Sequence, residues 1–260
     1  MSKRSPYFKS TEENEEEPPK KRLQNKSNLE DPAASFLICT SIPTLTKIKM
    51  GDKFFNQESS ALARALLGKV LIRCVDSELL CGRIVETEAY QGLMDKACHS
   101  FNSKRTDRTE PMFMKPGTVY VYSIYGMYHC FNISSGGDGA AVLLRALEPL
   151  SGIQLMRQLR SRHRKMNRVY LPHQLCNGPS KLCLSYDITM ELNKSDMTIP
   201  SSKIWIENWS PQPPFTTIIT TRIGLSKKAG EWIDAPLRFY LKGSKSISVV
   251  DRAKESNMSM

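Results

Sequence analysis

Short apolar runs of strand length recur from residue 70 onward, and they limit the folds that this chain can adopt. "KVLIRCV" and "LLCGRIVETEAY" are separated by a polar turn, and "GTVYVYSIYGMYHCFNISS" indicates a hairpin with Tyr125-Gly126 at its tip. "AAVLLRALEPL" predicts another apolar strand, and the second half adds "SKIWIENW", "FTTIITTRIGL", "PLRFYLKG" and "SISVVD". Strands joined by such short turns are expected to pair mostly antiparallel.

Three other segments, one before these runs and two among them, are predicted to be helices. "NQESSALARALLG" offers Ser59 or Ser60 as an N-cap and Gly68 as a stop. "SGIQLMRQLRSRHRKM" is apolar on one side and strongly basic on the other, and "GPSKLCLSYDI" opens with residues that suit a helix N-terminus. Neither an internal repeat nor a linker is visible after residue 51. The pattern predicts one compact α+β domain over residues 51–252, with flanking helices.

The ends of the chain differ in composition from this domain. Residues 1–50 are expected to form a tail, because "STEENEEEPPKKRLQNKSNLEDP" is an acidic run, a Pro pair and a basic cluster with little to bury. Residues 36–50 are more apolar and are expected to lie against the domain, and residues 253–260 to form a flexible C-terminal tail. "PPKKRLQNK", residues 18–26, resembles a nuclear-import signal, although a solvated charge run is the alternative. The predicted location is the nucleus, with mitochondria left open.

Charge and cysteine usage narrow the class of protein. The 260 residues include 37 Lys and Arg against 26 Asp and Glu, a net charge of +11 that favours a polyanionic partner such as nucleic acid. Seven cysteines without a CxxC pair indicate reduced thiols in an intracellular compartment. The four histidines show no metal-ligand spacing with the cysteines, so no metal is expected. The polar N-terminus and the lack of a long apolar run predict no signal peptide and no membrane partner, and a monomer is expected.

The stretch "VETEAYQG" places two acids and an aromatic residue on alternate positions. Along a strand, Glu86, Glu88 and Tyr90 therefore share one face, while Thr87 and Ala89 point the other way. That face is either exposed to water or lines a cleft, and the spacing alone does not decide between them.

The expected hairpin concentrates tyrosines. Tyr120, Tyr122, Tyr125 and Tyr128 lie within nine residues, and Tyr125 is at the tip, where turns of this length normally prefer Asn-Gly or Gly-X. Tyr125 either folds back on its own hairpin or acts as a wedge that inserts between stacked bases.

Basic residues gather further along the chain. Seven Lys and Arg occur from Arg145 to Arg168 against a single acid, Glu148. Lys181 follows in "NGPSK", where a helix N-terminus and an ammonium group together would suit a phosphate. The alternative is an ordinary solvated basic helix.

Six motifs in order resemble one enzyme family. "RIVETEAYQG", "ACHS", "MFMKPGTVYVYSIYGMYHCFNISS", "GAAVLLRALEP", "GPSKLC" and "PLRFY" are similar to the alkyladenine (3-methylpurine) DNA glycosylases over about residues 51–252. The resemblance implies a curved antiparallel sheet with a protruding hairpin. It also implies a monofunctional glycosylase of base excision repair, without lyase activity or a cofactor. Such an enzyme flips 3-methyladenine, 7-methylguanine, hypoxanthine or ethenoadenine out of double-stranded DNA and hydrolyses the N-glycosidic bond, leaving an abasic site.

The resemblance also assigns catalytic roles. Glu88 corresponds to the general base that deprotonates a water molecule, whereas Glu86 does not. Arg145 and the main-chain carbonyl of Ile223 correspond to groups that hold the same water. Which group protonates a neutral leaving base is left open.

Other positions correspond to groups that hold the base and the DNA. Tyr90 and Tyr122 match the aromatic pair around the flipped base, with His99 at the edge of the pocket. Asn132 matches the residue that crowds the 2-amino group of guanine, and Tyr125 matches the tyrosine that fills the gap in the duplex.

Two further residues are expected on the DNA-contacting surface, namely Met112 and Lys181. The loop "FNSKRTDRTEP", residues 101–111, is only loosely similar to the family, so its role stays open.

Two alternatives remain beside a glycosylase. One is a non-catalytic protein that binds duplex DNA, in which Glu88 is only a strand acid. The other is an RNA-directed or tRNA-modifying protein, since basic helices and stacking tyrosines suit single strands too. The joint presence of Glu88, Arg145 and Tyr125 favours the enzyme.

Overall fold

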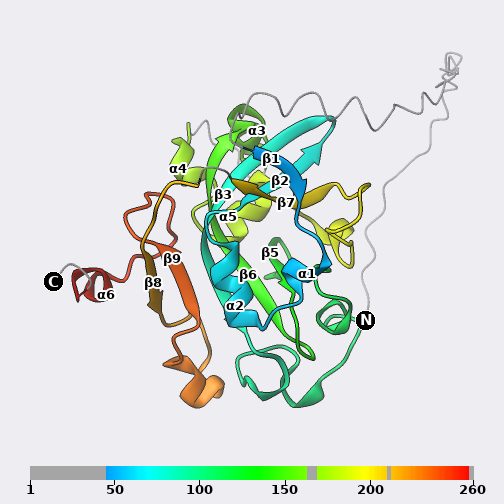
Figure 1. Cartoon of the computed structure of the whole chain (residues 1–260), viewed down its shortest axis with the longest axis vertical. Helices are drawn as coiled ribbons and strands as arrows, with labels where there is room; N and C mark the ends of the chain where they lie inside the picture. Colours follow the sequence, from blue (N-terminus) through cyan, green and yellow to red (C-terminus); the bar gives the residue numbers. More distant parts are fainter. Residues whose placement is uncertain (1–44, 163–168, 210–211, 258–260) are drawn as a thin grey trace, which may run out of the picture. The chain divides into compact units, whose positions relative to one another are not determined.

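A computed structural model describes residues 45–162, 169–209 and 212–257. Its nine strands form one antiparallel sheet in the order β1-β7-β2-β3-β6-β5-β4, with β9 pairing β3 and β8 pairing β9 (Figure 1). The strands are β1 (Leu45–Lys49), β2 (Val70–Val75), β3 (Glu78–Tyr90), β4 (Val119–Ile124), β5 (Tyr128–Ser134), β6 (Ala141–Ser151), β7 (Ile204–Trp209), β8 (Thr217–Thr220) and β9 (Arg238–Leu241). The expected α+β class with a curved antiparallel sheet is confirmed.

The helices are short and lie between or beside the strands. They are α1 (Asp52–Phe55), α2 (Ser59–Leu66), α3 (Ile153–Arg162), α4 (Pro172–Leu175), α5 (Pro179–Ser185) and α6 (Arg252–Asn257). Single turns of 3-10 helix are η3 (Gly92–Met94), η4 (Phe101–Ser103), η5 (Glu110–Phe113) and η6 (Met190–Leu192), with the longer η7 (Lys227–Ile233). None of the helices in the described ranges is long and apolar enough to cross a membrane.

The long strand β3 changes partners halfway along. On one side it pairs with β2 up to Arg83 and with β9 at Glu86–Glu88. On the other side it pairs with β6 from Cys81 to Tyr90. The register with β6 slips three times, and two of the slips lie near the acids: Ile84 pairs with Leu147 and Glu86 with Ala146, and then Thr87 pairs with Leu144. Val85 and Arg145 are therefore each an extra residue, and such bulges bend a strand and redirect its side chains.

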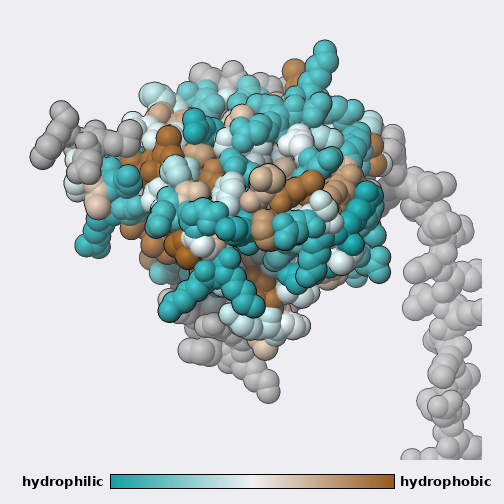
Figure 2. Space-filling model, turned by 90° about the horizontal axis from the view of Figure 1, so that it is seen from below, coloured by the Kyte–Doolittle hydropathy of each residue, from teal (hydrophilic) through white to brown (hydrophobic). Residues whose placement is uncertain are grey.

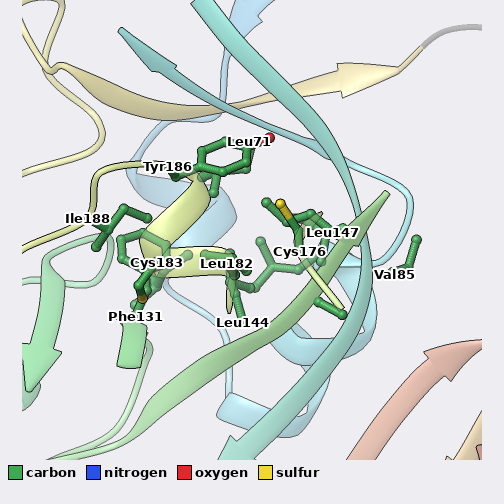
Figure 3. Packing of buried hydrophobic residues seen from close by; sticks show 14 of the residues in the cluster. Leu71, Val85, Phe131, Leu144, Leu147, Cys176, Leu182, Cys183, Tyr186 and Ile188 are labelled. Carbon is green, nitrogen blue, oxygen red and sulfur yellow. The ribbon is translucent and has the colours of Figure 1, made fainter. Parts of the chain in front are cut away.

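One face of this sheet carries the hydrophobic core. Leu182 and Cys183 of α5, with Tyr186 just after it, pack on Phe131, Leu144 and Leu147 of β5 and β6 (Figure 3). Leu62 and Leu66 of α2 belong to the same cluster and are fully buried. Burial of a large apolar side chain contributes about 1.5–3 kcal/mol, so α2 and α5 are fixed firmly on this face. Most charged groups that β3 and β6 carry therefore lie on the other face.

The structure differs from the sequence-based expectations in several local features. Glu58, not Ser59 or Ser60, is the N-cap of α2, because the Ser60 hydroxyl donates to the Glu58 carboxylate instead. Gly68 follows the helix with φ 78°, as its predicted stop requires. "SISVVD" is not a strand: its Ser248 turns inward and uses its amide and hydroxyl on Glu86.

The predicted domain limits also shift slightly. β1 precedes residue 51 and pairs with β7, and α6 lies in the segment expected to be a flexible tail. The import signal at residues 18–26 lies outside the described residues.

Candidate active site

Polar and aromatic side chains from four strands meet on the face of the sheet opposite the core. Glu88 of β3 is opposite Leu143 of β6, Leu143 is opposite Asn132 of β5, and Asn132 is opposite Tyr120 of β4. Residues directly opposite one another share a face, so this row brings Glu88 and the tyrosines of β4 to one side. Thr87 points the other way and donates to Ala63 in α2, which confirms the predicted alternation.

This face forms a cavity of about 560 Å³. A volume of this size suits a small ring system held between protein groups. Seven of the predicted site residues line it: Tyr90, His99, Met112, Tyr122, Asn132, Arg145 and Ile223. Seen from below, the surface is mostly hydrophilic, and hydrophobic residues reach it in scattered groups (Figure 2).

Glu88 is completely buried beside this cavity, and three donors converge on its carboxylate. Oε1 accepts from the Ile223 amide at 2.7 Å and from Arg145 Nη1 at 3.1 Å, and Oε2 accepts from the Tyr90 hydroxyl at 3.0 Å. A carboxylate has about four acceptor positions, so Oε2 keeps one for a further donor such as water. Ile223 contacts Glu88 through its N–H, and the predicted role of its carbonyl stays a prediction.

Arg145 lies between the two acids of "VETEAY". Its Nε is 3.3 Å from Glu86 Oε1. The Glu86 carboxylate also accepts hydrogen bonds from Arg238 Nη1 and from the Ser248 amide, both at 2.7 Å. Burial works to lower the pKa of Arg145, but Glu88 and Glu86 outweigh it and raise that pKa, so the guanidinium stays charged. Glu86 thus accepts from Arg145, Arg238 and Ser248, and the choice of Glu88 over Glu86 as the base stays a prediction.

Tyr90 is supported from behind by a buried ion pair that no sequence pattern predicted. The Arg222 guanidinium lies 4.7 Å from the Tyr90 ring centre and forms two bonds to Asp95, one of them at 2.9 Å. Asp95 also accepts from the amides of Gln91 and Ala97, which fixes the segment after β3. Burial, and then the charge of Glu88, raise the pKa of Tyr90, so its hydroxyl stays protonated and donates to Glu88.

His99 and Tyr122 form a second aromatic wall. Their rings meet edge to face at 4.7 Å, and His99 Nδ1 is 2.8 Å from the Tyr120 hydroxyl. His99 Nε2 faces Arg108 Nη2 at 3.4 Å, and since a guanidinium only donates, Nε2 accepts and Nδ1 carries the proton. Burial, and then the charges of Arg108 and Lys104, lower the pKa of His99 to about 4.

This low pKa predicts a pH-dependent loss of stability. The pKa of His99 is about 4 in the folded protein against 6.5 ordinarily, so the unfolded chain takes up the proton first as the pH falls. Stability should therefore be unaffected above pH 6.5 and fall by roughly 3 kcal/mol between there and about pH 4. Denaturant unfolding of the wild type and His99→Gln across this range checks it. The difference between the two proteins should narrow as the pH falls, and parallel curves would contradict the prediction.

Asn132 and Met112 complete the cavity wall. Asn132 is 4 % exposed, and its Nδ2 donates to the Tyr120 carbonyl at 3.0 Å, which fixes the orientation of the amide. Met112, expected on the DNA-contacting surface, is only 3 % exposed and lines the cavity instead. Met112 is part of η5 and is buried there, packed against Cys98, Tyr120 and Ala141.

Tyr125 and Lys181 lie outside the cavity lining. Tyr125 is 89 % exposed with φ 53°, Gly126 follows with φ 70°, and the Met127 amide donates to Ile124 across the turn. These are the angles of a type I′ turn, and the exposure rules out a ring folded back on its own strands. Lys181 is exposed at the first turn of α5, and its Nζ contacts Asn177 Oδ1 at 3.0 Å.

Known proteins are similar to this chain over most of its length. The profile of the family "Methylpurine-DNA glycosylase" matches residues 53–245, which include every predicted site residue. The human "DNA-3-methyladenine glycosylase" is 50 % identical over 213 residues, covering 80 % of this chain and 71 % of the human protein. The mouse protein of that name is 46 % identical over 246 residues, covering 93 % of this chain and 72 % of its own length. The "Probable DNA-3-methyladenine glycosylase" of Encephalitozoon cuniculi is 44 % identical over 198 residues, with 76 % and 92 % covered. The chain belongs to the methylpurine-DNA glycosylase family.

Proposed function

We propose that this protein is a DNA-3-methyladenine glycosylase of base excision repair, which hydrolyses the N-glycosidic bond of damaged purines in duplex DNA. The observation that carries the proposal is the buried Glu88 carboxylate, held by Arg145, Ile223 and Tyr90 at the wall of an aromatic cavity. The names of the related proteins and the net charge of +11 support a DNA substrate.

The target base reaches the cavity by leaving the DNA stack. Extrusion of a nucleotide costs a few kcal/mol, and less for a damaged or mismatched base. Tyr125 offsets part of this cost by stacking in the space that the base leaves, and its exposed turn makes the ring available for that role. In the cavity the purine stacks between Tyr90 and Tyr122, which both line it.

Hydrolysis then follows at the sugar. Glu88 takes a proton from water, the water oxygen forms a bond to C1′, and the C1′–N bond breaks with its electron pair leaving on the base. Positioned general-base catalysis of this kind contributes on the order of 10²–10⁴ in rate. Arg145, which is 3.1 Å from Glu88, stabilises the negative charge of the Glu88 carboxylate, which must be ionised in order to accept the proton from water.

Selection of damaged purines comes from the cavity and not from the basic surface. Contacts to phosphates supply affinity for any DNA and carry no information about damage. A cationic alkylated purine leaves as a neutral base and is attracted to aromatic faces. Asn132, whose amide is fixed by its bond to the Tyr120 carbonyl, crowds the 2-amino group of normal guanine in this proposal.

A Tyr125→Gly variant isolates the role of the exposed ring. Glycine adopts the positive φ of this position without strain, so the turn and the melting temperature should be kept. Loss of base stacking should slow single-turnover excision by on the order of tenfold. Tyr125→Phe is the matched control and should stay near the wild type. If both variants excise as fast as the wild type, Tyr125 does not act in base extrusion.

The proposed activity is tested with duplexes that carry one hypoxanthine or one methylated purine. Strand cleavage at the lesion after alkali, but not before it, would support a glycosylase without lyase activity. Binding without any product on either lesion would instead support a non-catalytic DNA-binding protein. Competition with single-stranded DNA and tRNA completes the test, because preference for tRNA would favour the RNA-directed alternative.

A further inference from the structure

The loop that follows His99 is built as a rigid unit. Arg105 forms two 2.8 Å bonds to Glu110 across it, and its guanidinium lies 5.1 Å from the Phe113 ring. Thr109, only 2 % exposed, donates to the Lys104 carbonyl at 2.9 Å and accepts from the Thr106 amide at 2.8 Å. This segment is only loosely similar to the family in the sequence, and its internal bonds hold Arg108 in place.

Arg108 is held against the aromatic wall of the cavity. Its guanidinium lies 5.1 Å from the centre of the Tyr122 ring, and its Nη2 is 3.4 Å from His99 Nε2. Arg108 does not line the cavity, so a base that stacks on Tyr122 from inside the cavity would lie on the ring face away from this guanidinium. A base on the cavity side would thus lie across one ring from a positive charge.

The other charges around the cavity are mostly compensated. Arg222 behind Tyr90 is paired with Asp95, and the rim residue Lys96 is paired with Glu231 at 2.9 Å. Arg145 and Arg238 are balanced by Glu86 and Glu88. In the described part of the chain none of the ion pairs involves Arg108, Lys104 near His99 or Lys228 at the cavity rim. Of these three cations, Arg108 is the one in contact with a stacking tyrosine.

We propose that Arg108 is a specificity-determining residue that biases excision toward neutral purine lesions and against cationic alkylated purines. The inference rests on the proposed function and deepens it, since it names the class of substrate that the same site prefers. A cation on one face of a ring draws electron density away from the other face, which weakens the attraction of that face for a second cation.

The departing base adds a second contribution of the same sign. When the C1′–N bond breaks, its electron pair goes to the base. A cationic purine then becomes neutral, whereas a neutral lesion becomes an anion until water or another donor protonates it. The charge of Arg108 stabilises that anion and does nothing comparable for a base that leaves neutral. Both effects therefore favour neutral lesions.

The test compares two lesions in one duplex sequence, hypoxanthine as the neutral base and 7-methylguanine as the cationic one. For the full chain and Arg108→Gln, single-turnover rates and kcat/KM in competition give the ratio of hypoxanthine to 7-methylguanine excision. Glutamine keeps an N–H donor for His99 Nε2 but removes the charge, so the ratio should fall by about three- to tenfold. Arg108→Lys should retain most of the ratio, and it guards against misfolding of the first variant.

Arg64→Gln is the matched control. Arg64 is also an exposed arginine on an aromatic ring, 4.9 Å from Phe239, but it lies on α2 behind the sheet, so its loss should leave the ratio unchanged. An unchanged ratio in Arg108→Gln would overturn the proposal. An equal fall on both lesions, with a weaker salt dependence, would also overturn it and indicate a phosphate contact. A wild type inactive on both lesions would instead refute the proposed function itself.

Discussion

Glu88→Gln should lose excision of hypoxanthine by on the order of 10²–10⁴ in single-turnover rate while its affinity for the lesion duplex stays close to that of the wild type. Glutamine cannot take a proton from water, so only the contribution of stacking and orientation remains. The substitution fits the site: Oε1 can still accept from Ile223 and Arg145, and Nε2 can donate to the Tyr90 hydroxyl oxygen. A loss of rate would therefore report chemistry and not collapse of the cavity.

The measurement pairs a quenched single-turnover assay with binding to the same duplex. Glu148→Gln is the matched control, because Glu148 lies on the same sheet but is 44 % exposed and pairs only with Arg83 at 3.6 Å. It should excise like the wild type. A Glu88→Gln protein with undiminished rate would move the base elsewhere, and a protein with lost binding would show that Glu88 acts in recognition.

Asp95→Ala should destabilise the fold by about 3–5 kcal/mol, the largest effect on stability that we expect from a single charge at the site. Asp95 and Arg222 are both completely buried, and the substitution leaves a guanidinium with no counter-charge. It also removes the acceptor for the Gln91 and Ala97 amides. Tyr90 then loses the support behind its ring, so excision should fall as well.

Denaturant unfolding of Asp95→Ala and of Lys96→Ala compares the stability lost with a buried ion pair and with an exposed one. Lys96 is the next residue in the chain and also forms an ion pair, with Glu231, but the two side chains are 41 % and 68 % exposed. Exposed pairs contribute at most about 1 kcal/mol. Similar losses in the two variants would show that the Arg222–Asp95 pair is not the buried support that the structure indicates.

Much of the fold was predictable because strand alternation and short turns are local signals. The pattern of "VETEAYQG" correctly placed Glu86, Glu88 and Tyr90 on one face. It could not tell that Glu86 is held by Arg238 and Ser248, because these residues lie more than 150 positions away in the sequence. The choice of Glu88 as the base comes from the resemblance to a family and stays a prediction.

Features that depend on distant pairing were missed. Asp95 and Arg222 are 127 residues apart, and nothing near either residue in the sequence announces the other. The bulge at Arg145 has no sequence signal in "LLRALEP", although it directs that side chain between two carboxylates. "SISVVD" was predicted to be a strand, but the amide and hydroxyl of Ser248 donate hydrogen bonds to the buried Glu86 instead of joining a sheet. In this segment the hydrogen bonds that a buried carboxylate requires determine the backbone conformation, and the local sequence pattern does not.

The most direct test of the central claim is a crystal structure of Glu88→Gln bound to a duplex with one hypoxanthine. We expect the lesion base in the cavity between Tyr90 and Tyr122, the Tyr125 ring in the gap that it leaves, and a water molecule between residue 88 and C1′ of the sugar. A hypoxanthine still stacked in the duplex, or bound on another surface with the cavity empty, would contradict it.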